Sequence, residues 1–316
     1  MLFSIFPYMR KLLFIFASSF SLLSCGVHDY LPNNQEKMVT ALQEALVFGS
    51  KTAATNLGDS SCSLADAEKM ECIKGYLGNK LVEIVLPDTV KDVLNRVNSF
   101  TKSIDNLSPE AKQILNSVMG SAYSSILSLG KYGDSIKVAL NRGAEQAAPK
   151  SINVFKNAIS LMSFSDAKGL LMGDSVAATT YLNVTTYSEL QTAFSPIIKE
   201  PLDLLNPNKY WKTLASHYNS FARTYSSFKS DPLTSNLLGN SLSDLPYNAL
   251  PEDISQALSE YAVGKALDGL FLMVGKQEAQ LRADPWGTVK AAGGFITDAV
   301  GDLLGDIFSK AKSKTL

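Results

Sequence analysis

Lys265-Ala266-Leu267-Asp268-Gly269-Leu270-Phe271-Leu272-Met273 is the stretch that says most about the fold of this chain. With Val274 after it, the run places apolar side chains over most of the circumference that a helix would have. Such a helix is normally buried on several sides. The stretch therefore predicts a central helix within a helical segment from Ile254 to Arg282. Asp253 could cap the start of this segment, and Asp284-Pro285 follows its end.

Two charges on this stretch call for partners. Lys265 and Asp268 are three residues apart and so share a helix face. Because burying either charge alone would cost several kcal/mol, we expect them to pair with each other or with charged groups elsewhere. The candidate polar cluster is Arg142, Glu145, Asp166, Lys168, Lys265 and Asp268. If the cluster lines a cleft it is a candidate site, and if it is sealed it is a structural network, which is the outcome we favour.

Helical patterns extend outward from this segment. An apolar face begins after Glu36, and Ser108-Pro109-Glu110 is a helix start signal. Ser163 with Asp166 forms a capping box before a helix that Gly173 ends, and Thr186 with Glu189 predicts a further helix start. The fold class is all-α, an irregular multi-helix array.

One apolar run interrupts the helical pattern. Residues 81–86 (LVEIVL) are partly β-branched and end at Pro87, which suits either a strand or the packed end of a loop. Since no second β-rich run could pair with it, we expect at most one short extended segment, near 81–86. Residues 230–252 are rich in Pro, Asn, Gly and Ser and indicate a long loop.

A series of mostly aromatic residues recurs at alternating steps of three and four, as on one face of a helix. It comprises Trp211, Leu214, Tyr218, Phe221, Tyr225 and Phe228. This aromatic seam is either a core face, which we favour, or a ligand groove or partner site, because tyrosines bring polar tips that a dry core must satisfy.

The N-terminal residues indicate export and a lipid anchor. Arg10 and Lys11 precede an apolar run from Leu12 to Leu23 that is too short to cross a bilayer. Leu22-Leu23-Ser24-Cys25 resembles a bacterial lipobox, in which Cys25 carries the lipid; an ordinary signal peptide with a chance cysteine is the alternative. The expected organisation is a lipoprotein signal peptide (1–24), a tether (25–35) and a single helical domain (36–316). Translation could start at Met1 or at Met9.

The residue after Cys25 and the net charge of the chain indicate where the protein is located and which kinds of partner it binds. Gly26 stands where an aspartate would often retain a lipoprotein at the inner membrane, so we expect a lipid anchor in the outer membrane and a body in the periplasm. The chain has 29 basic and 30 acidic side chains, and removing residues 1–24 takes away only two basic ones. A weakly acidic body without basic blocks argues against nucleic acid as a partner. The expected partners are the membrane, through the lipid, and a protein or an apolar ligand.

Cys62 and Cys72 predict a disulfide. They bracket a polar stretch, and a lone cysteine pair at this separation is usually oxidised in the periplasm. A metal site would need further ligands nearby, and neither His28 nor His217 is close in sequence. We expect neither a metal nor a cofactor.

No catalytic pattern is recognisable. Gly173-Asp174-Ser175-Val176 superficially resembles the nucleophile block of GDSL-type hydrolases, but it follows a helix instead of a strand, and Leu214, not aspartate, precedes His217 by three. Asp174 is more simply a helix N-cap. The candidate catalytic carboxylates are Glu145, Asp166, Asp174 and Asp268. Each of them could equally be a helix cap or the partner of a nearby basic side chain. We expect a protein that is not an enzyme.

Several stretches together resemble a bacterial envelope lipoprotein family catalogued as domain of unknown function 4197. They are 75–79 (GYLGN) with the run to Pro87, 140–145 (LNRGAE) with Ala148-Pro149, 166–174 (DAKGLLMGD), Thr185-Thr186 with Leu190 and Phe194, and 265–273 (KALDGLFLM) with Glu278, Arg282 and Asp284-Pro285. The resemblance spans about Ala41 to Thr288. It implies a mainly helical, secreted or lipid-anchored protein, and it carries over no activity and no catalytic residue.

The leading functional hypothesis is a non-enzymatic lipoprotein that binds or scaffolds something at the outer membrane. The alternatives are a carrier that holds an apolar ligand between helices and a carboxylate-based hydrolase or lyase. A closed aromatic seam would favour the scaffold, an open apolar cavity the carrier, and acids that converge in a cleft the enzyme.

Overall fold

The computed structural model describes residues 35–119 except 71, residues 129–204, and residues 249–288 except 252–254 and 286. It also describes residues 212–213, 215–220, 223, 302 and 304–306. In this part of the chain the secondary structure is helical and no strand occurs, which confirms the predicted all-α array. Among the helices described there, none has a run long and apolar enough to cross a membrane.

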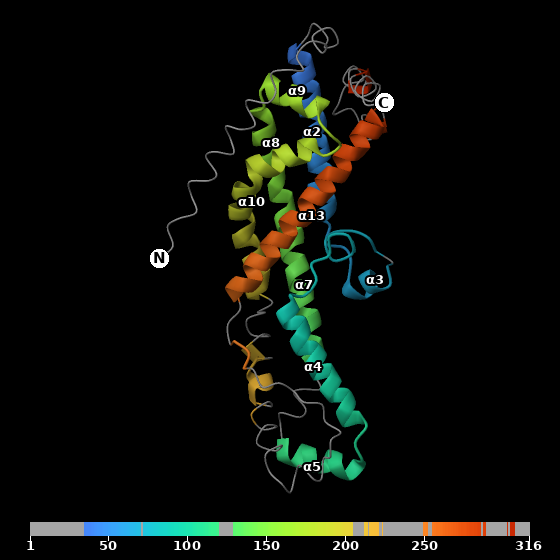
Figure 1. Cartoon of the computed structure of the whole chain (residues 1–316), viewed down its shortest axis with the longest axis vertical. Helices are drawn as coiled ribbons and strands as arrows, with labels where there is room; N and C mark the ends of the chain where they lie inside the picture. The colour runs from blue at the N-terminus through green and yellow to red at the C-terminus, as the bar shows by residue number, and fades with distance from the viewer. Residues whose placement is uncertain are drawn as a thin grey trace, which may run out of the picture.

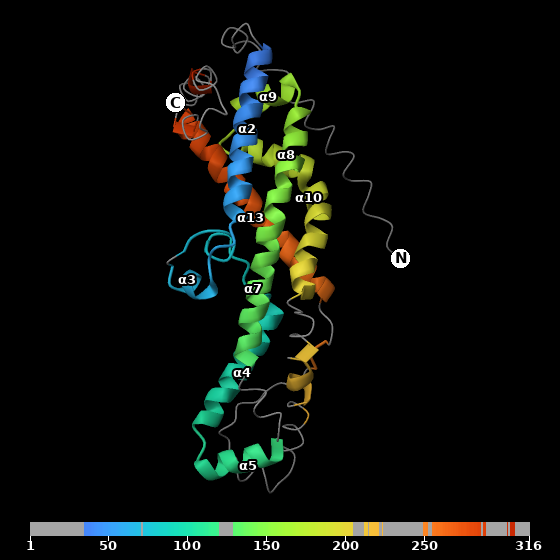
Figure 2. The same cartoon turned by 180° about the vertical axis from the view of Figure 1, so that it is seen from behind.

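The helices form an elongated bundle (Figures 1 and 2). In chain order they are α2 (Gln35–Leu57), α3 (Leu64–Glu68), α4 (Asp88–Asp105), α5 (Pro109–Met119), α7 (Leu129–Ala147), the 3₁₀ turn η1 (Ala148–Lys150), α8 (Ser151–Ser160), α9 (Phe164–Met172), α10 (Ala177–Leu204) and α13 (Ser255–Ala283). Helices α2, α7, α8, α10 and α13 pack together in the upper part, and α4 extends α7 downward towards α5 (Figure 1).

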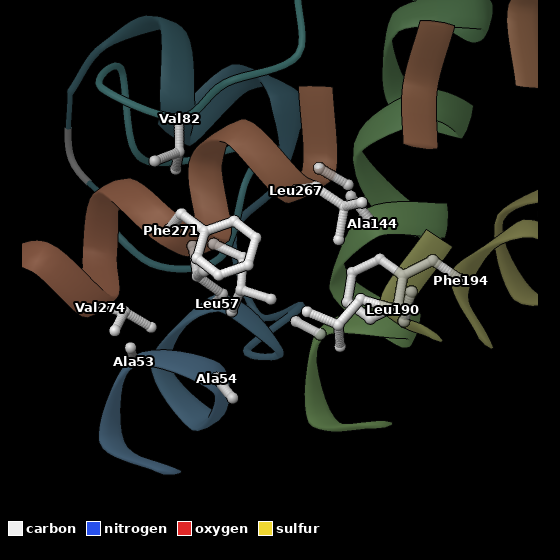
Figure 3. Close-up of a cluster of buried hydrophobic side chains, with 14 of the residues drawn as sticks. Ala53, Ala54, Leu57, Val82, Ala144, Leu190, Phe194, Leu267, Phe271 and Val274 are labelled. Atoms are coloured by element: carbon white, nitrogen blue, oxygen red, sulfur yellow. The ribbon is translucent and has the colours of Figure 1, made fainter. Parts of the chain in front are cut away.

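Helix α13 is central, as its sequence predicts. It crosses the bundle obliquely and contacts α2, α7 and α10 (Figure 1). Figure 3 shows Leu267, Phe271 and Val274 of α13 directed towards small side chains of α2 and α7 and towards Leu190 and Phe194 of α10. The Phe271 ring also meets Phe155 of α8 edge-on, with 5.9 Å between the ring centroids. The helix is not buried on every side, however, because the Leu272 side chain is 44% exposed.

The boundaries of α9 agree with the sequence, and the start of α10 does not. The Ser163 hydroxyl accepts from the Asp166 N–H at 3.1 Å, as in the predicted capping box, and Gly173 follows the last residue of α9. The predicted start at Thr186 is wrong, because α10 is continuous from Ala177. The Thr186 hydroxyl is buried and donates to the Leu182 carbonyl at 2.5 Å. A threonine can satisfy its hydroxyl in this way inside a helix, so it need not mark a cap.

Residues 81–86 form the packed end of a loop. A turn covers 80–82, and residues 83–87 lead irregularly into α4. The Asn141 side chain of α7 accepts from the Ile84 N–H and donates to the Ile84 carbonyl, both at 2.8 Å. This amide takes the place of a neighbouring strand, so the buried backbone of Ile84 is satisfied without a sheet.

The predicted disulfide between Cys62 and Cys72 is present, with the two Cα atoms 5.6 Å apart. It closes a loop that follows α2 and contains the short helix α3. Close packing continues behind the bridge, because a Cβ atom added at Gly78 would lie 2.4 Å from the Cys62 sulfur.

Candidate functional site

Arg142 and Glu145 form a buried ion pair where α7 meets the disulfide loop. The Glu145 side chain is fully buried, and its Oε2 lies 2.5 Å from Arg142 Nη1. Its Oε1 accepts from the backbone N–H groups of Tyr76 at 3.1 Å and Leu77 at 3.0 Å. Arg142 also donates to the carbonyl oxygens of Ser60 and Cys62. The pair therefore joins α7 to both ends of the disulfide loop.

The electrostatics of this pair fit a structural role. Burial raises the pKa of the Glu145 carboxyl, while the N–H of Leu77, the Arg142 guanidinium and the N–H of Tyr76 act to lower it. Burial, with the Glu145 charge, raises the pKa of the Tyr76 phenol strongly. That phenol donates to the Ala266 carbonyl of α13 at 2.6 Å. Both carboxylate oxygens of Glu145 are thus engaged by protein donors.

A second buried pair, Glu278 and Arg282 of α13, was not among the residues proposed for the cluster. Glu278 is 4% exposed, and its carboxylate accepts from the N–H of Ala178 at 3.0 Å and of Thr179 at 2.8 Å. It thereby caps the start of α10 from another helix. Arg282 lies 2.8 Å from the same carboxylate and donates to the Leu170 carbonyl near the end of α9. The resemblance included both residues, but only the packing of α10 shows what they bind.

The remaining members of the predicted cluster do not join these pairs. Lys265 and Asp268 do pair, at 3.1 Å, but their side chains are 49% and 65% exposed, so the expected burial is wrong. They share the outward face of α13 with the exposed Leu272. Asp166 caps its own helix α9, and Lys168 lies half-buried on the same helix. The six residues therefore form separate contacts instead of one site.

The other sequence candidates are only partly covered by the structure. Of the aromatic seam, Tyr218 is buried in the core, while Trp211, Leu214, Phe221, Tyr225 and Phe228 lie outside the described residues, as does Cys25. Asp174 accepts from the Val176 N–H at 3.0 Å just before α10, which agrees with a capping role. Within the described part of the chain, no three His, Cys, Asp or Glu residues gather as a metal site would require.

An open groove of about 740 Å³ lies between α2 and α8. The two helices lie side by side in the upper bundle (Figure 2). Its apolar lining consists of Val47 and Phe48 from α2 and Ile152 and Ile159 from α8. The polar lining consists of Gln43, Glu44, Lys51, Thr52, Thr55 and Asn56 from α2 and Asn153, Lys156 and Ser160 from α8.

Contacts at both ends bound this α2/α8 groove. At one end the Gln43 amide donates to the Ile159 carbonyl at 3.0 Å. At the other end Gly58 approaches Pro149 so closely that an added Cβ atom would lie 2.7 Å from the proline ring. The helices are thus antiparallel; Gln43 and Ile159 are themselves lining residues at one end, and Gly58 and Pro149 lie beyond the lining at the other. Sequence patterns did not reveal the groove, because its two walls lie about 100 residues apart in the chain and each wall alone is an ordinary amphipathic helix face.

A second hollow of about 500 Å³ lies between the start of α4 and the start of α13. Its lining includes Pro87, Val93, Leu250 and Leu258. Tyr261 stands at its side and donates to the Val85 carbonyl at 2.9 Å. This hollow is smaller than the α2/α8 groove and has less polar lining.

Comparison with known proteins identifies a family and no activity. No curated protein and no solved structure matches the chain. The family model described as "Protein of unknown function (DUF4197)" matches residues 109–292. The match begins later than the resemblance, which extended back to about Ala41; it includes α8 and both buried ion pairs, and it leaves out α2 and the disulfide loop. Since it covers more than half of the chain, the chain belongs to this DUF4197 family.

Proposed function

We propose that this chain is a non-enzymatic envelope protein that is anchored to the outer membrane by a lipid on Cys25 and binds an apolar molecule in the α2/α8 groove. The observation that carries the binding role is the groove itself, which is open and has an apolar floor. Its volume of about 740 Å³ lies within the range of roughly 300–1,000 Å³ for small-molecule sites. The anchor rests on the lipobox at residues 22–25.

The arrangement of the acids supports binding over carboxylate catalysis. Both oxygens of Glu145 and of Glu278 accept from backbone N–H groups or arginine. Asp166 and Asp174 accept from nearby backbone N–H groups at helix starts. These carboxylate oxygens accept hydrogen bonds that hold helices and loops in place.

The shape of the groove favours an elongated small molecule. The contacts at Gln43 and Gly58 close the groove at its ends. A single apolar chain lying along Val47, Phe48 and Ile152 fits this slot.

Photolabelling tests the groove directly. Full-length lipidated protein in phosphatidylcholine nanodiscs would be irradiated with the methyl ester of a diazirine-bearing palmitic acid, and labelled residues would be mapped by mass spectrometry. We expect labels on the groove residues of α2 and α8. Thr52→Trp should reduce this labelling severalfold, because Thr52 lines the groove and an indole ring would fill it.

The matched control is Thr192→Trp, since Thr192 is an exposed threonine of α10 that does not line the groove. The groove residues of Thr192→Trp should be photolabelled to the same extent as those of the wild type. Both variants should unfold cooperatively on heating, which shows that they are folded. Labelling spread evenly over the surface, or labelling unaffected by Thr52→Trp, would refute the proposed binding site.

A further inference from the structure

We infer that the end of the bundle at α9 lies on the phospholipid bilayer to which the chain is anchored, with Leu161 and Met172 among the lipids. This inference rests on the lipid anchor of the proposed function and not on the groove. It assigns the surface of the molecule that faces the membrane, which a lipid on Cys25 alone does not determine.

Helix α9 has an exposed face without charged side chains. Ser165, Gly169 and Met172 are spaced by four and three residues, so they share one side of the helix. All three are exposed. This α9 face lies opposite the residues that α9 buries in the core, which are Ala167, Leu170 and Leu171.

Two large apolar side chains are in contact with solvent at this end of the bundle. Met172 is 42% exposed, and Leu161, at the turn between α8 and α9, is 83% exposed. Gly169 comes between them in the chain, and a Cβ atom added there would have no neighbour within 4 Å. Because apolar groups gain free energy by leaving water, both side chains would be more stable at the boundary of head groups and acyl chains.

The length of the tether says what covers this end. Cys25 lies ten residues before Gln35, the first residue of α2, and a chain of ten residues spans at most about 35 Å. Helix α9 packs against α2. Both views place α9 and the start of α2 at one end of the elongated bundle and α5 at the other (Figures 1 and 2). A lipid on Cys25 would therefore keep the α9 end close to the bilayer.

The residue types favour lipid over a protein partner. The residues that contribute most to protein interfaces are tryptophan, tyrosine and arginine, and neither the α9 face nor Leu161 supplies one. The charged residues of α9, Asp166 and Lys168, are half-buried and lie outside the face. A neutral phospholipid surface requires no opposite charge, only apolar groups that can insert.

Photolabelling from the lipid tests the inference. Full-length lipidated protein would be placed in phosphatidylcholine nanodiscs in which part of the lipid carries a diazirine on an acyl chain, and labelled residues would be mapped by mass spectrometry. We expect severalfold more label on Leu161 and Met172 than on Ile73 and Leu81. Those two side chains are 75% and 62% exposed but lie at or near the disulfide loop, away from the α9 end.

Gly169→Glu should reduce the label on Leu161 and Met172 severalfold, because a carboxylate resists leaving water and the site has room for the side chain. The matched control is Gly264→Glu, since Gly264 of α13 also has no neighbour within 4 Å. It lies 18 residues before Arg282, which contacts α9, and so about 27 Å from that contact along the helix. This control should be labelled like the wild type, and both variants should unfold cooperatively.

The outcomes separate the anchor from the membrane contact. Wild-type protein that does not stay on the nanodiscs would refute the lipid anchor and this inference with it. Protein that stays but is labelled equally at the α9 end and the disulfide loop would overturn the contact while the anchor stands, as would folded Gly169→Glu that is labelled like the wild type. Unlabelled Leu161 and Met172 on nanodiscs that carry two protein chains would assign this end to a second copy and also overturn the inference. The comparison within the wild type needs neither variant.

Discussion

At the scale of single residues, Glu145 and Glu278 have the same arrangement of hydrogen-bond partners in two parts of the protein. Each is a buried carboxylate that pairs with an arginine of its own helix and accepts from two consecutive N–H groups of another segment. The sequence placed Arg142 and Glu145 in the candidate polar cluster without pairing them, although residues three apart on one helix share a face. It could not show their backbone partners, since Tyr76 is 69 positions away and Ala178 is 100 positions from Glu278.

Glu145→Ala should lower the free energy of unfolding by about 3–5 kcal/mol, because it leaves a partly buried arginine and two buried N–H groups without their acceptor. Chemical denaturation followed by circular dichroism measures this loss. Asp268→Ala is the control, since it breaks an exposed pair and should cost at most about 1 kcal/mol. Equal losses for the two variants would contradict the structural role of the buried pair.

Asp59 should titrate at unusually low pH. Hydrogen bonds from Ser61 and, to a smaller extent, the Lys74 ammonium lower the pKa of this carboxyl to about 2 from its ordinary value of 3.8. Because the folded pKa is the lower one, the stability that Asp59 contributes is complete above about 3.8 and is lost as the pH falls towards 2. Carbon-13 NMR titration of the carboxyl should show this midpoint, and Ser61→Ala should move it upward. A midpoint near 3.8 in the wild type would refute these contacts.

Cys25→Ser should release the protein from lipid attachment, because the thiol is the atom that carries the diacylglyceryl group in a lipobox. Metabolic labelling with a radioactive fatty acid would measure the attachment, and fractionation of outer and inner membranes would measure the location. The wild type should be labelled and sediment with the outer membrane, and the variant should do neither. A labelled Cys25→Ser variant would mean that the lipid is attached elsewhere.

At the scale of elements, the sequence located α13 better than it located α10. The apolar run at 265–273 predicted a central helix, and only its outward face with Lys265, Asp268 and Leu272 departed from that prediction. The start of α10 was misplaced, because its cap comes from Glu278 in another helix. A capping box is a local pattern, so it carries no information about a cap supplied from 100 residues away.

Glycines of α13 provide a test of its packing. A Cβ atom added at Gly269 would lie 2.8 Å from the Tyr76 ring and 3.1 Å from Val82. We therefore expect Gly269→Ala to destabilise the protein by about 1–3 kcal/mol through overpacking. Gly264→Ala is a control on the same helix, since it has no neighbour within 4 Å. It should raise stability by about 0.5–1 kcal/mol through helix propensity. Thermal unfolding measures both effects, and melting temperatures that shift in the same direction in the two variants would contradict this packing.

At the scale of the whole molecule, the α2/α8 groove depends on how distant helices are brought together. Neither α2 nor α8 carries a motif that indicates a site, so the groove becomes visible only when the two walls face each other. The family match includes α8 and leaves out α2, so one wall lies within the matched segment and the other precedes it. The two walls nevertheless meet the same core, because α2 packs against α13, α8 packs against α10, and α10 and α13 pack against each other.

Native mass spectrometry of the protein as the cell makes it tests groove binding most directly. Lipidated wild type and Thr52→Trp would be purified in parallel from outer membranes, and molecules that leave the protein without breaking a covalent bond would be weighed. The wild type should carry a small apolar or amphiphilic molecule that the variant lacks, because the indole ring occupies its place between α2 and α8. The same bound molecule in the same amount on both proteins would contradict the groove as the binding site.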